Sequence, residues 1–487
     1  MRYFFSLVLI LLIIPTVAQE TIFEQTIKID KAIQTDSYLT QSDVGNEFAF
    51  TLKEGNYLWG MSFDELGKLA GNVATNVPDK RYEVHLGSTF HDGVSNLYFS
   101  NSMKTNFIVK TLDYKSKTSE ENRIPVFLNE EFLVGGFRHK KHFYFLVVNE
   151  VRPVLKLYKL SGAKTENFWE MDFSKYGFEK SSLFKFLGGK ASDFYLPKIE
   201  NIVDGKYQTL QKGTDLIKAY SKKDGLMITV DDKKEDTKII DFNLETEEFT
   251  FRSIPKPGCE CRKVQKVNSF ILDNYIFNIQ ACQTHVSTTM RDLESLELLY
   301  QTKVEKSENI EENTYFKTEE KSGLFDKEQI KIISSGKFVE NVDGGFAGLV
   351  ANQYDGQLEM KIGSIYFKTT APVSNFGFSP SIGSVNTASG VVNLTGPLSF
   401  QPPYFRYQGG IVETFYYQYV NIADLSETPS AHGTINPYRA LEEKINDVVK
   451  EKSKTLSIVK IDQLDEVFLL SYYNKKTGKF IIEKWEL

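Results

Sequence analysis

The sequence has few of the residues that mark the common enzyme and metal-protein families. Its 487 residues include three cysteines, three tryptophans and six histidines. It has no Gly-x-Ser-x-Gly nucleophile motif, His-Glu-x-x-His zinc motif, phosphate-binding glycine loop or dinucleotide fingerprint. These absences disfavour the large motif-bearing enzyme classes, and no cofactor is predicted. Composition alone leaves catalysis undecided and favours a role other than that of an enzyme.

An excess of charge of one sign is also missing. Lysine and arginine total 58 against 64 aspartates and glutamates, which gives a formal net charge of −6. That value is small for a chain of this length, and no block of basic residues stands alone. Because nucleic-acid binding draws on clustered positive charge, nucleic acid is not expected as a partner.

Only one long apolar run is present, and it lies at the N-terminus. Arg2 precedes a nearly continuous apolar stretch over residues 3–14, and a proline separates this stretch from small residues ending at Ala18. This order is typical of a secretory signal peptide. The run is shorter than the roughly 20 apolar residues that span a bilayer. We therefore predict a signal peptide over residues 1–18 and an exported mature chain, periplasmic or extracellular, without a transmembrane segment.

Strand-forming sequence is abundant by comparison. Tyrosine and phenylalanine number 25 and 37, and short apolar segments alternate with polar turns. The clearest example is a three-strand meander over residues 225–230, 237–242 and 249–251. Similar units recur, and their first strongly apolar strands begin near eight positions: Phe48, Leu97, Phe143, Leu226, Tyr275, Phe346, Ile411 and Val467.

The shorter spacings between these positions match the size of one blade of a β-propeller, about 40–50 residues with three or four strands. One small sheet cannot bury both of its faces alone, whereas radial stacking covers each face with a neighbouring sheet. The chain thus resembles the β-propeller superfamily in generic terms. It lacks the repeat signatures of the WD40, kelch and sialidase types, so the resemblance implies the fold alone. We predict an all-β propeller of about seven blades, within a range of six to eight.

Residues 19–487 are expected to form a single propeller domain with insertions near residues 301–340 and 369–455. The charged stretch over residues 301–330 is expected to be a solvated loop. Aspartate-glycine pairs at positions 92, 204, 224, 343 and 355 fit tight hairpin turns. Alternating residues near the N-terminus predict a first strand that joins the last blade and closes the ring.

One short amphipathic helix is predicted within the second insertion. Asn436 is a suitable N-cap, and Pro437 suits the first helical position. The helix should pack its apolar face on a blade. That face carries Leu441, Ile445, Val448 and Val449.

The segment over residues 369–405 carries no charged residue and is rich in serine, glycine, asparagine and proline. Such a loop either binds a ligand or covers sheet edges. As a binding surface it would suit a neutral glycan or a peptide or protein ligand, because aromatic planes and amides can hold such ligands without desolvating a charge. The candidate ligand-binding residues are Phe376, Phe378, Asn393, Phe400 and Tyr404.

The three cysteines, Cys259, Cys261 and Cys282, fall within one repeat. Outside the cytoplasm thiols tend to oxidise, so a local disulfide between Cys282 and one of the other two is expected. The spacing does not choose the partner, and one thiol is left over. The alternative is a Cys3His metal site that adds His285 to the three cysteines.

The remaining histidines are weak candidates for chemistry. His139 and His142 lie in a basic turn between two expected strands, where they could bind a metal or an anion, but charged hairpin tips are usually only solvated. His91 and His432 have no partner that the sequence identifies.

The function favoured by these features is a secreted or periplasmic propeller that acts as a binding or scaffolding module for an envelope or extracellular ligand. The first alternative is a glycan-directed hydrolase or lyase on the same fold, which would need carboxylates near the central channel. The second is an outer-membrane β-barrel, which the contiguous apolar strands disfavour because a barrel wall alternates lipid-facing and lumen-facing residues.

Overall fold

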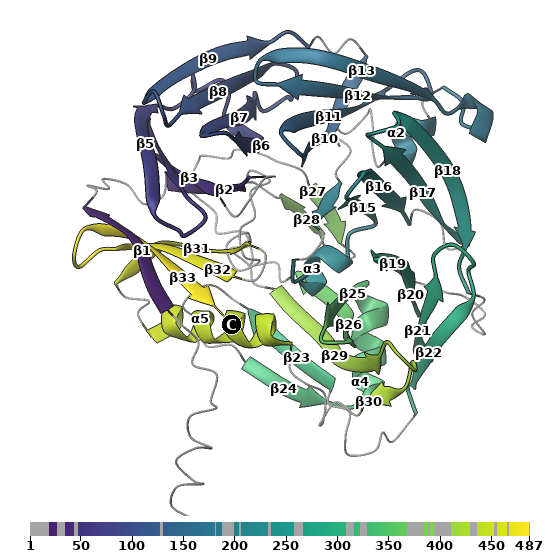
Figure 1. The fold of residues 1–487 in the computed structure, drawn as a ribbon. Coiled ribbons are helices and arrows are strands. Elements are labelled where there is room, and N and C mark those ends of the chain that lie inside the picture. Colours follow the sequence, from purple (N-terminus) through teal and green to yellow (C-terminus); the bar gives the residue numbers. More distant parts are fainter. Residues whose placement is uncertain are drawn as a thin grey trace, which may run out of the picture.

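The structure is a computed structural model. It describes residues 19–26, 35–42, 47–126, 130–180, 182–187, 199–203, 206–231, 235–257, 266–307, 316–321, 329–367, 384–387, 390–393, 411–428, 436–451, 455–464 and 467–486. In these ranges the strands form separate sheets arranged around a central axis, as Figure 1 shows. The chain is a β-propeller, the predicted architecture.

Seven of the described sheets have four or more strands, and we number them as blades in chain order. Blade 1 contains β2 (Thr35–Gln41), β3 (Phe48–Glu54), β4 (Tyr57–Phe63) and β5 (Leu69–Asn76). Blade 2 contains β6 (Val84–His91), β7 (Val94–Ser100), β8 (Phe107–Asp113) and β9 (Thr118–Ile124). Blade 3 contains β10 (Glu131–His139), β11 (His142–Asn149), β12 (Val154–Ser161) and β13 (Lys164–Asp172).

Blades 4 to 7 complete the ring. Blade 4 contains β14 (Glu200–Ile202), β15 (Ile217–Ser221), β16 (Gly225–Val230), β17 (Asp236–Asn243) and β18 (Glu248–Pro255). Blade 5 contains β19 (Lys266–Leu272), β20 (Tyr275–Ala281), β21 (His285–Asp292) and β22 (Leu298–Glu305). Blade 6 contains β25 (Phe346–Tyr354), β26 (Gln357–Phe367), β29 (Ile411–Asn421), β23 (Phe316–Lys321) and β24 (Gln329–Ile333), with β30 (Glu427–Thr428) paired to β29. Blade 7 contains β31 (Leu456–Leu464), β32 (Val467–Asn474), β33 (Lys479–Glu486) and β1 (Gln19–Thr26).

Strands in the interior of a blade are far more buried than its outer strand, as β11 and β13 of blade 3 show. β11 and β16, for example, are buried along nearly their whole length, because neighbouring blades cover both faces of such a strand. Six of the eight repeat positions found in the sequence mark second strands, with blade 4 counted from β15 because β14 is an added strand that pairs parallel with it. The other two, Phe346 and Ile411, begin β25 and β29 of the same blade. Eight positions therefore correspond to seven blades.

The predicted closure of the ring is confirmed. β1 pairs antiparallel with β33, from Gln19 opposite Trp485 to Thr26 opposite Lys479. Phe23 of β1 is 7% exposed and meets the ring of Phe63 in blade 1 edge to face, with the centroids 6.0 Å apart. The N-terminal strand thus completes blade 7 and contacts blade 1.

The structure contradicts the prediction made for the charged region. The expectation of a solvated loop over residues 301–330 is wrong for its described part, which includes portions of β22, β23 and β24. These are outer strands, whose exposed side chains can be charged without loss of pairing. The helix α4 (Ser335–Gly344) follows, and the Ser334 side chain accepts from the Lys337 N–H at 3.3 Å. The pair at 343 and 344 therefore ends a helix and does not form a hairpin turn.

Two other aspartate-glycine pairs form the expected turns. Asp92 and Gly93 join β6 to β7 with φ values of 50° and 75°. Asp355 and Gly356 join β25 to β26 with φ values of 48° and 71°. Both pairs use the left-handed region that tight hairpins require.

The predicted C-terminal helix is present as α5 (Pro437–Glu451). Leu441 and Ile445 are buried among apolar side chains of blade 7, with Val448 partly buried against them. Arg439, two residues before Leu441, donates from Nη1 to Glu359 Oε2 of blade 6 at 2.9 Å. The helix therefore packs on a blade as expected and also contacts the preceding blade (Figure 1).

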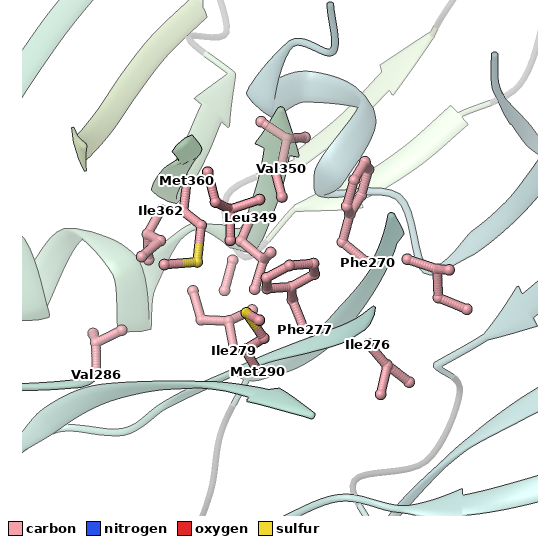
Figure 2. Close-up of a cluster of buried hydrophobic side chains, with 14 of the residues drawn as sticks. Phe270, Ile276, Phe277, Ile279, Val286, Met290, Leu349, Val350, Met360 and Ile362 are labelled. Carbon is pink, nitrogen blue, oxygen red and sulfur yellow. The ribbon is translucent and has the colours of Figure 1, made fainter. Parts of the chain in front are cut away.

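A large apolar core spans blades 4, 5 and 6. Figure 2 shows Phe277, Ile279 and Met290 of blade 5 facing Met360 and Ile362 of blade 6.

Each helix in the ranges given above is too short or too polar to cross a lipid bilayer.

Candidate binding site

A segment of blade 4 between β14 and β15 lies in the middle of the ring. It follows η2 (Ser174–Tyr176) and α2 (Ser182–Phe186) and includes α3 (Leu210–Gly213), which lies near the centre of Figure 1. We call residues 206–216 the central segment. Its Tyr207 N–H donates to Gln463 Oε1 of blade 7 at 2.7 Å. Its Gln208 N–H donates to Asn352 Oδ1 of blade 6 at 2.9 Å.

Close backbone packing holds the end of the central segment against blade 6. A Cβ atom added at Gly213 would lie 2.3 Å from the carbonyl oxygen of Leu349. One added at Gly348 would lie 2.7 Å from the Gly213 backbone. Glycine is therefore required on both sides of this contact, because any side chain would separate the two backbones.

A cavity of about 440 Å³ lies beside the central segment, between blades 4 and 5. Its lining includes residues of the β15–β16 turn and of the β19–β20 turn, and we call the side of the ring that carries these turns the turn face. Its lining combines apolar, amide and charged side chains. The lining residues are Ile202, Val203, Lys206, Gln208, Tyr220, Ser221, Lys222, Lys223, Asp224, Met227, Phe270, Ile271, Leu272, Asp273, Asn274 and Ala351.

The floor of the cavity is apolar. Phe270 is 1% exposed and Met227 is 5% exposed, and both belong to the core shared by blades 4 and 5. Tyr220 also lies in the floor, where its hydroxyl accepts from the Ile271 N–H at 3.2 Å. Burial raises the pKa of Tyr220 well above its usual value, so this phenol stays neutral.

The rim of the cavity carries charges that are largely paired. Lys222 Nζ lies 3.0 Å from Asp241 and 3.9 Å from Asp224. Asn243 Nδ2 donates to Asp224 at 3.2 Å. Lys223, the neighbouring residue, is exposed. The rim therefore holds both signs of charge close together.

A buried ionic cluster lies between the same two blades, toward the face opposite the turn face. Asp231 accepts from Lys256 Nζ at 2.9 Å, Thr237 Oγ1 at 2.7 Å and Ser269 Oγ at 2.7 Å. Lys218, with no exposed surface, has its Nζ 3.9 Å from Asp231.

Burial and pairing act differently on the two main members of this cluster. Burial opposes ionisation of Asp231, but Lys218 and Lys256 outweigh it and lower the pKa of the carboxyl. Burial lowers the pKa of Lys218 to about 8, against the attraction of Asp231. Because the cluster is closed to solvent and its carboxylate is saturated, its role is to join blades.

The ligand-binding residues predicted from the sequence lie largely outside the described residues. The four that lie outside are Phe376, Phe378, Phe400 and Tyr404. Asn393 ends β28 (Gly390–Asn393), which pairs with β27 (Ser384–Thr387).

The uncharged loop departs from the face opposite the cavity. It leaves blade 6 after Phe367 and returns at Ile411, and these ends lie across the blade from the turn at Asp355. The structure therefore offers a cavity on a face that the sequence did not indicate.

Two of the four residues of the metal hypothesis lie together. Cys282 Sγ is 3.7 Å from His285 Nδ1 and 3.3 Å from Thr284 Oγ1. Cys259 and Cys261 lie outside the described residues, so the disulfide and the Cys3His alternative both stay predictions. Within the described part of the chain, no three side chains of histidine, cysteine, aspartate or glutamate are grouped to hold a metal.

The basic turn forms the expected hairpin tip between β10 and β11. Lys140 pairs with Glu245 of blade 4 at 2.5 Å, and His142 Nδ1 lies 3.4 Å from Glu166 Oε2. Desolvation lowers the pKa of His142. His91 precedes the turn to β7, and His432 lies outside the described residues.

Comparisons with known proteins give no family. No protein-family model matches the chain, and no curated protein sequence is similar to it. Among solved structures, the Dos1 propeller is 6% identical, with 96% of this chain and 95% of that chain covered and a TM-score of 0.33. A subtype N10 neuraminidase-like protein of A/little yellow-shouldered bat/Guatemala/060/2010 is 9% identical, with 71% of this chain and 96% of that chain covered and a TM-score of 0.28.

Dihydro-heme d1 dehydrogenase NirN in complex with DHE is 13% identical to the chain, with a TM-score of 0.26. The match covers 53% of this chain and spans 45% of the length of that protein. All three scores are low, so we base the fold on the strand pairing described above.

Proposed function

We propose that the protein is exported and acts as a binding module outside the cytoplasm, with a neutral glycan or a peptide or protein as its ligand. The cavity between blades 4 and 5 is the observation that carries this proposal. Its volume of about 440 Å³ falls among small-ligand pockets, which span about 300–1,000 Å³, and it combines an apolar floor with a polar rim.

Export is supported by the apolar run over residues 3–14 and by the small residues that end at Ala18. Expression of the full-length chain in a secreting host tests this step. The N-terminal sequence of the exported protein should begin near Gln19. Retention of residues 1–18 on a protein held in the membrane would contradict export as a processed chain.

Export also bears on the cysteines, because thiols outside the cytoplasm tend to oxidise to disulfides. We propose that Cys282 is paired with either Cys259 or Cys261. Cys282 directly follows Ala281, which pairs with Lys266, and the two other cysteines lie five and seven positions before Lys266. That distance along the chain is short enough for either pairing.

A ligand panel tests the binding role. The purified protein is titrated with neutral oligosaccharides and with uncharged peptides, and each mixture is assayed both for retention and for released product. Retention without product supports a binding module. Product release from a glycan would favour the hydrolase or lyase alternative and overturn the proposal.

Two variants then locate the site. Asn274→Trp places a large side chain at the mouth of the cavity, and Tyr404→Ala removes an aromatic from the uncharged loop. Loss of binding in the first variant alone places the ligand at the cavity, whereas loss in the second alone places it at the loop. A melting temperature close to that of the parent protein is required of both variants.

A further inference from the structure

We propose that the cavity between blades 4 and 5 takes a large uncharged apolar side chain presented by a peptide segment. This inference rests on the proposed binding function and names the ligand class at that site. Three features of the lining carry it: the state of its aromatic residues, the pairing of its charges, and the two hairpin turns at its mouth.

The aromatic residues of the cavity are unsuited to a sugar ring. Sugars are commonly held against exposed aromatic planes, with hydroxyl groups bonded to free polar side chains. Here Phe270 and Tyr220 are 1% and 6% exposed, so neither offers an open face. The Tyr220 hydroxyl already accepts from a backbone N–H. The floor presents apolar edges that favour an aliphatic or aromatic side chain.

The charges of the rim disfavour a charged ligand group. Lys222 is held between Asp241 and Asp224. A ligand carboxylate would meet Asp224 and Asp273 of the lining. A ligand ammonium would meet Lys206, Lys222 and the exposed Lys223. Burying a charge without a dedicated partner is costly. The free-energy cost of entering the cavity is therefore lowest for an uncharged group.

The mouth of the cavity suits a peptide backbone. Asn274 lies at the β19–β20 turn with an exposed side chain whose amide can both donate and accept, as a peptide group does. Its own carbonyl accepts from the Leu293 N–H at 2.7 Å, which anchors the turn within blade 5. Lys223 lies on the other hairpin turn that borders the cavity. An inserted residue would therefore have one of these exposed side chains on each bordering turn.

The test uses acetylated and amidated Gly-Ser-X-Ser-Gly peptides in which X is leucine, phenylalanine, alanine or aspartate. Binding to the full mature chain is measured by calorimetric or fluorescence titration. Burial of a leucine or phenylalanine side chain should lower the dissociation constant by about tenfold or more relative to alanine. The aspartate peptide should bind no better than the alanine peptide. Equal affinity for all four peptides would overturn the inference.

Blocking variants locate the binding. Asn274→Trp and Lys223→Trp approach the cavity from its two walls, so the inference survives a folding failure of either one. Each should raise the dissociation constant of the leucine peptide by about tenfold. The matched control is Lys141→Trp at the β10–β11 turn. Lys141 and Asn274 are both exposed, and each follows a residue with a φ of about +50°, Lys140 at 51° and Asp273 at 50°. The control should bind the peptide as the parent does.

Failure of this inference and failure of the binding function give different results. If maltohexaose binds and Asn274→Trp abolishes that binding, the cavity is a glycan site and the peptide inference is wrong, while the binding function stands. If neither the peptides nor a broad panel of neutral oligosaccharides binds, both fail. Unchanged peptide binding in both blocking variants would contradict the site assignment.

Discussion

Lys218 Nζ donates to Asn268 Oδ1 at 2.6 Å and so joins β15 of blade 4 to β19 of blade 5. The same amide donates from Nδ2 to the carbonyl oxygens of Gly213 and Ala347 at 3.1 and 3.0 Å. One asparagine therefore connects blade 4, blade 5, blade 6 and the central segment. Because the central segment forms one wall of the cavity, this network also sets the shape of the candidate site.

The buried lysine gives the stability of the protein a pH dependence. The pKa of Lys218 falls from 10.5 in a free lysine to about 8 in the folded chain because the side chain is buried. Between these pH values the unfolded chain binds more protons, so the free energy of unfolding rises with pH from about 8 to 10.5. Below pH 8 both states hold the proton, and this contribution is constant.

Urea unfolding of the parent protein and of Lys218→Met at several values from pH 7.5 to 10.5 checks this dependence. The parent should gain on the order of 3 kcal/mol relative to the variant across the window. Lys223→Met, at an exposed position, should follow the parent at every pH. A difference between parent and Lys218→Met that does not change with pH would contradict the assignment.

The contact between the central segment and blade 6 depends on a glycine. In Gly213→Ala the new methyl group would meet the Leu349 carbonyl oxygen at 2.3 Å, so the two backbones must separate. We expect a loss of about 2–3 kcal/mol in the free energy of unfolding, as for overpacked cores. The matched control is Gly344→Ala, where an added Cβ has no neighbour within 4 Å and stability should be unchanged or slightly higher. Similar losses in both variants would argue against the contact.

Closure of the ring by the N-terminal strand β1 should contribute to the stability of the protein. Deleting residues 20–30 removes the outer strand of blade 7 and should lower the melting temperature by about 10 °C or more. A point variant separates packing from chain length. Phe23→Ala should cost about 3 kcal/mol because this ring is buried between blades 7 and 1. Glu24→Ala, which removes an exposed ion pair with Lys479, should cost less than about 1 kcal/mol. An unchanged melt of the deletion would contradict closure.

The sequence predicted the strands whose residues are apolar on both faces. A second strand such as β11 is apolar on both faces and was identified without difficulty. Strand β15 was missed because it carries Lys218, a charged residue that is buried only because partners such as Asn268 of blade 5 satisfy it. No local pattern contains that information.

The cavity was missed for a related reason. Its lining comes from two hairpin turns, a short strand and the central segment, which are far apart in the chain and carry ordinary turn residues. The only signal in the sequence was the long spacing between the repeats at Phe143 and Leu226, which indicates extra chain but not its position. The aromatic loop over residues 369–405, which did have a distinctive composition, leaves from the opposite face.

The number of free thiols tests whether the cysteines form a disulfide. If Cys282 is paired with Cys259 or Cys261, the unfolded and unreduced protein should contain close to one reactive thiol per chain, as an Ellman titration in guanidinium would show. The reduced protein should contain three, the full number in the sequence. Three thiols without reduction, together with one equivalent of zinc by elemental analysis, would reject the disulfide. His285, with its Nδ1 3.7 Å from Cys282 Sγ, would then become the fourth metal ligand.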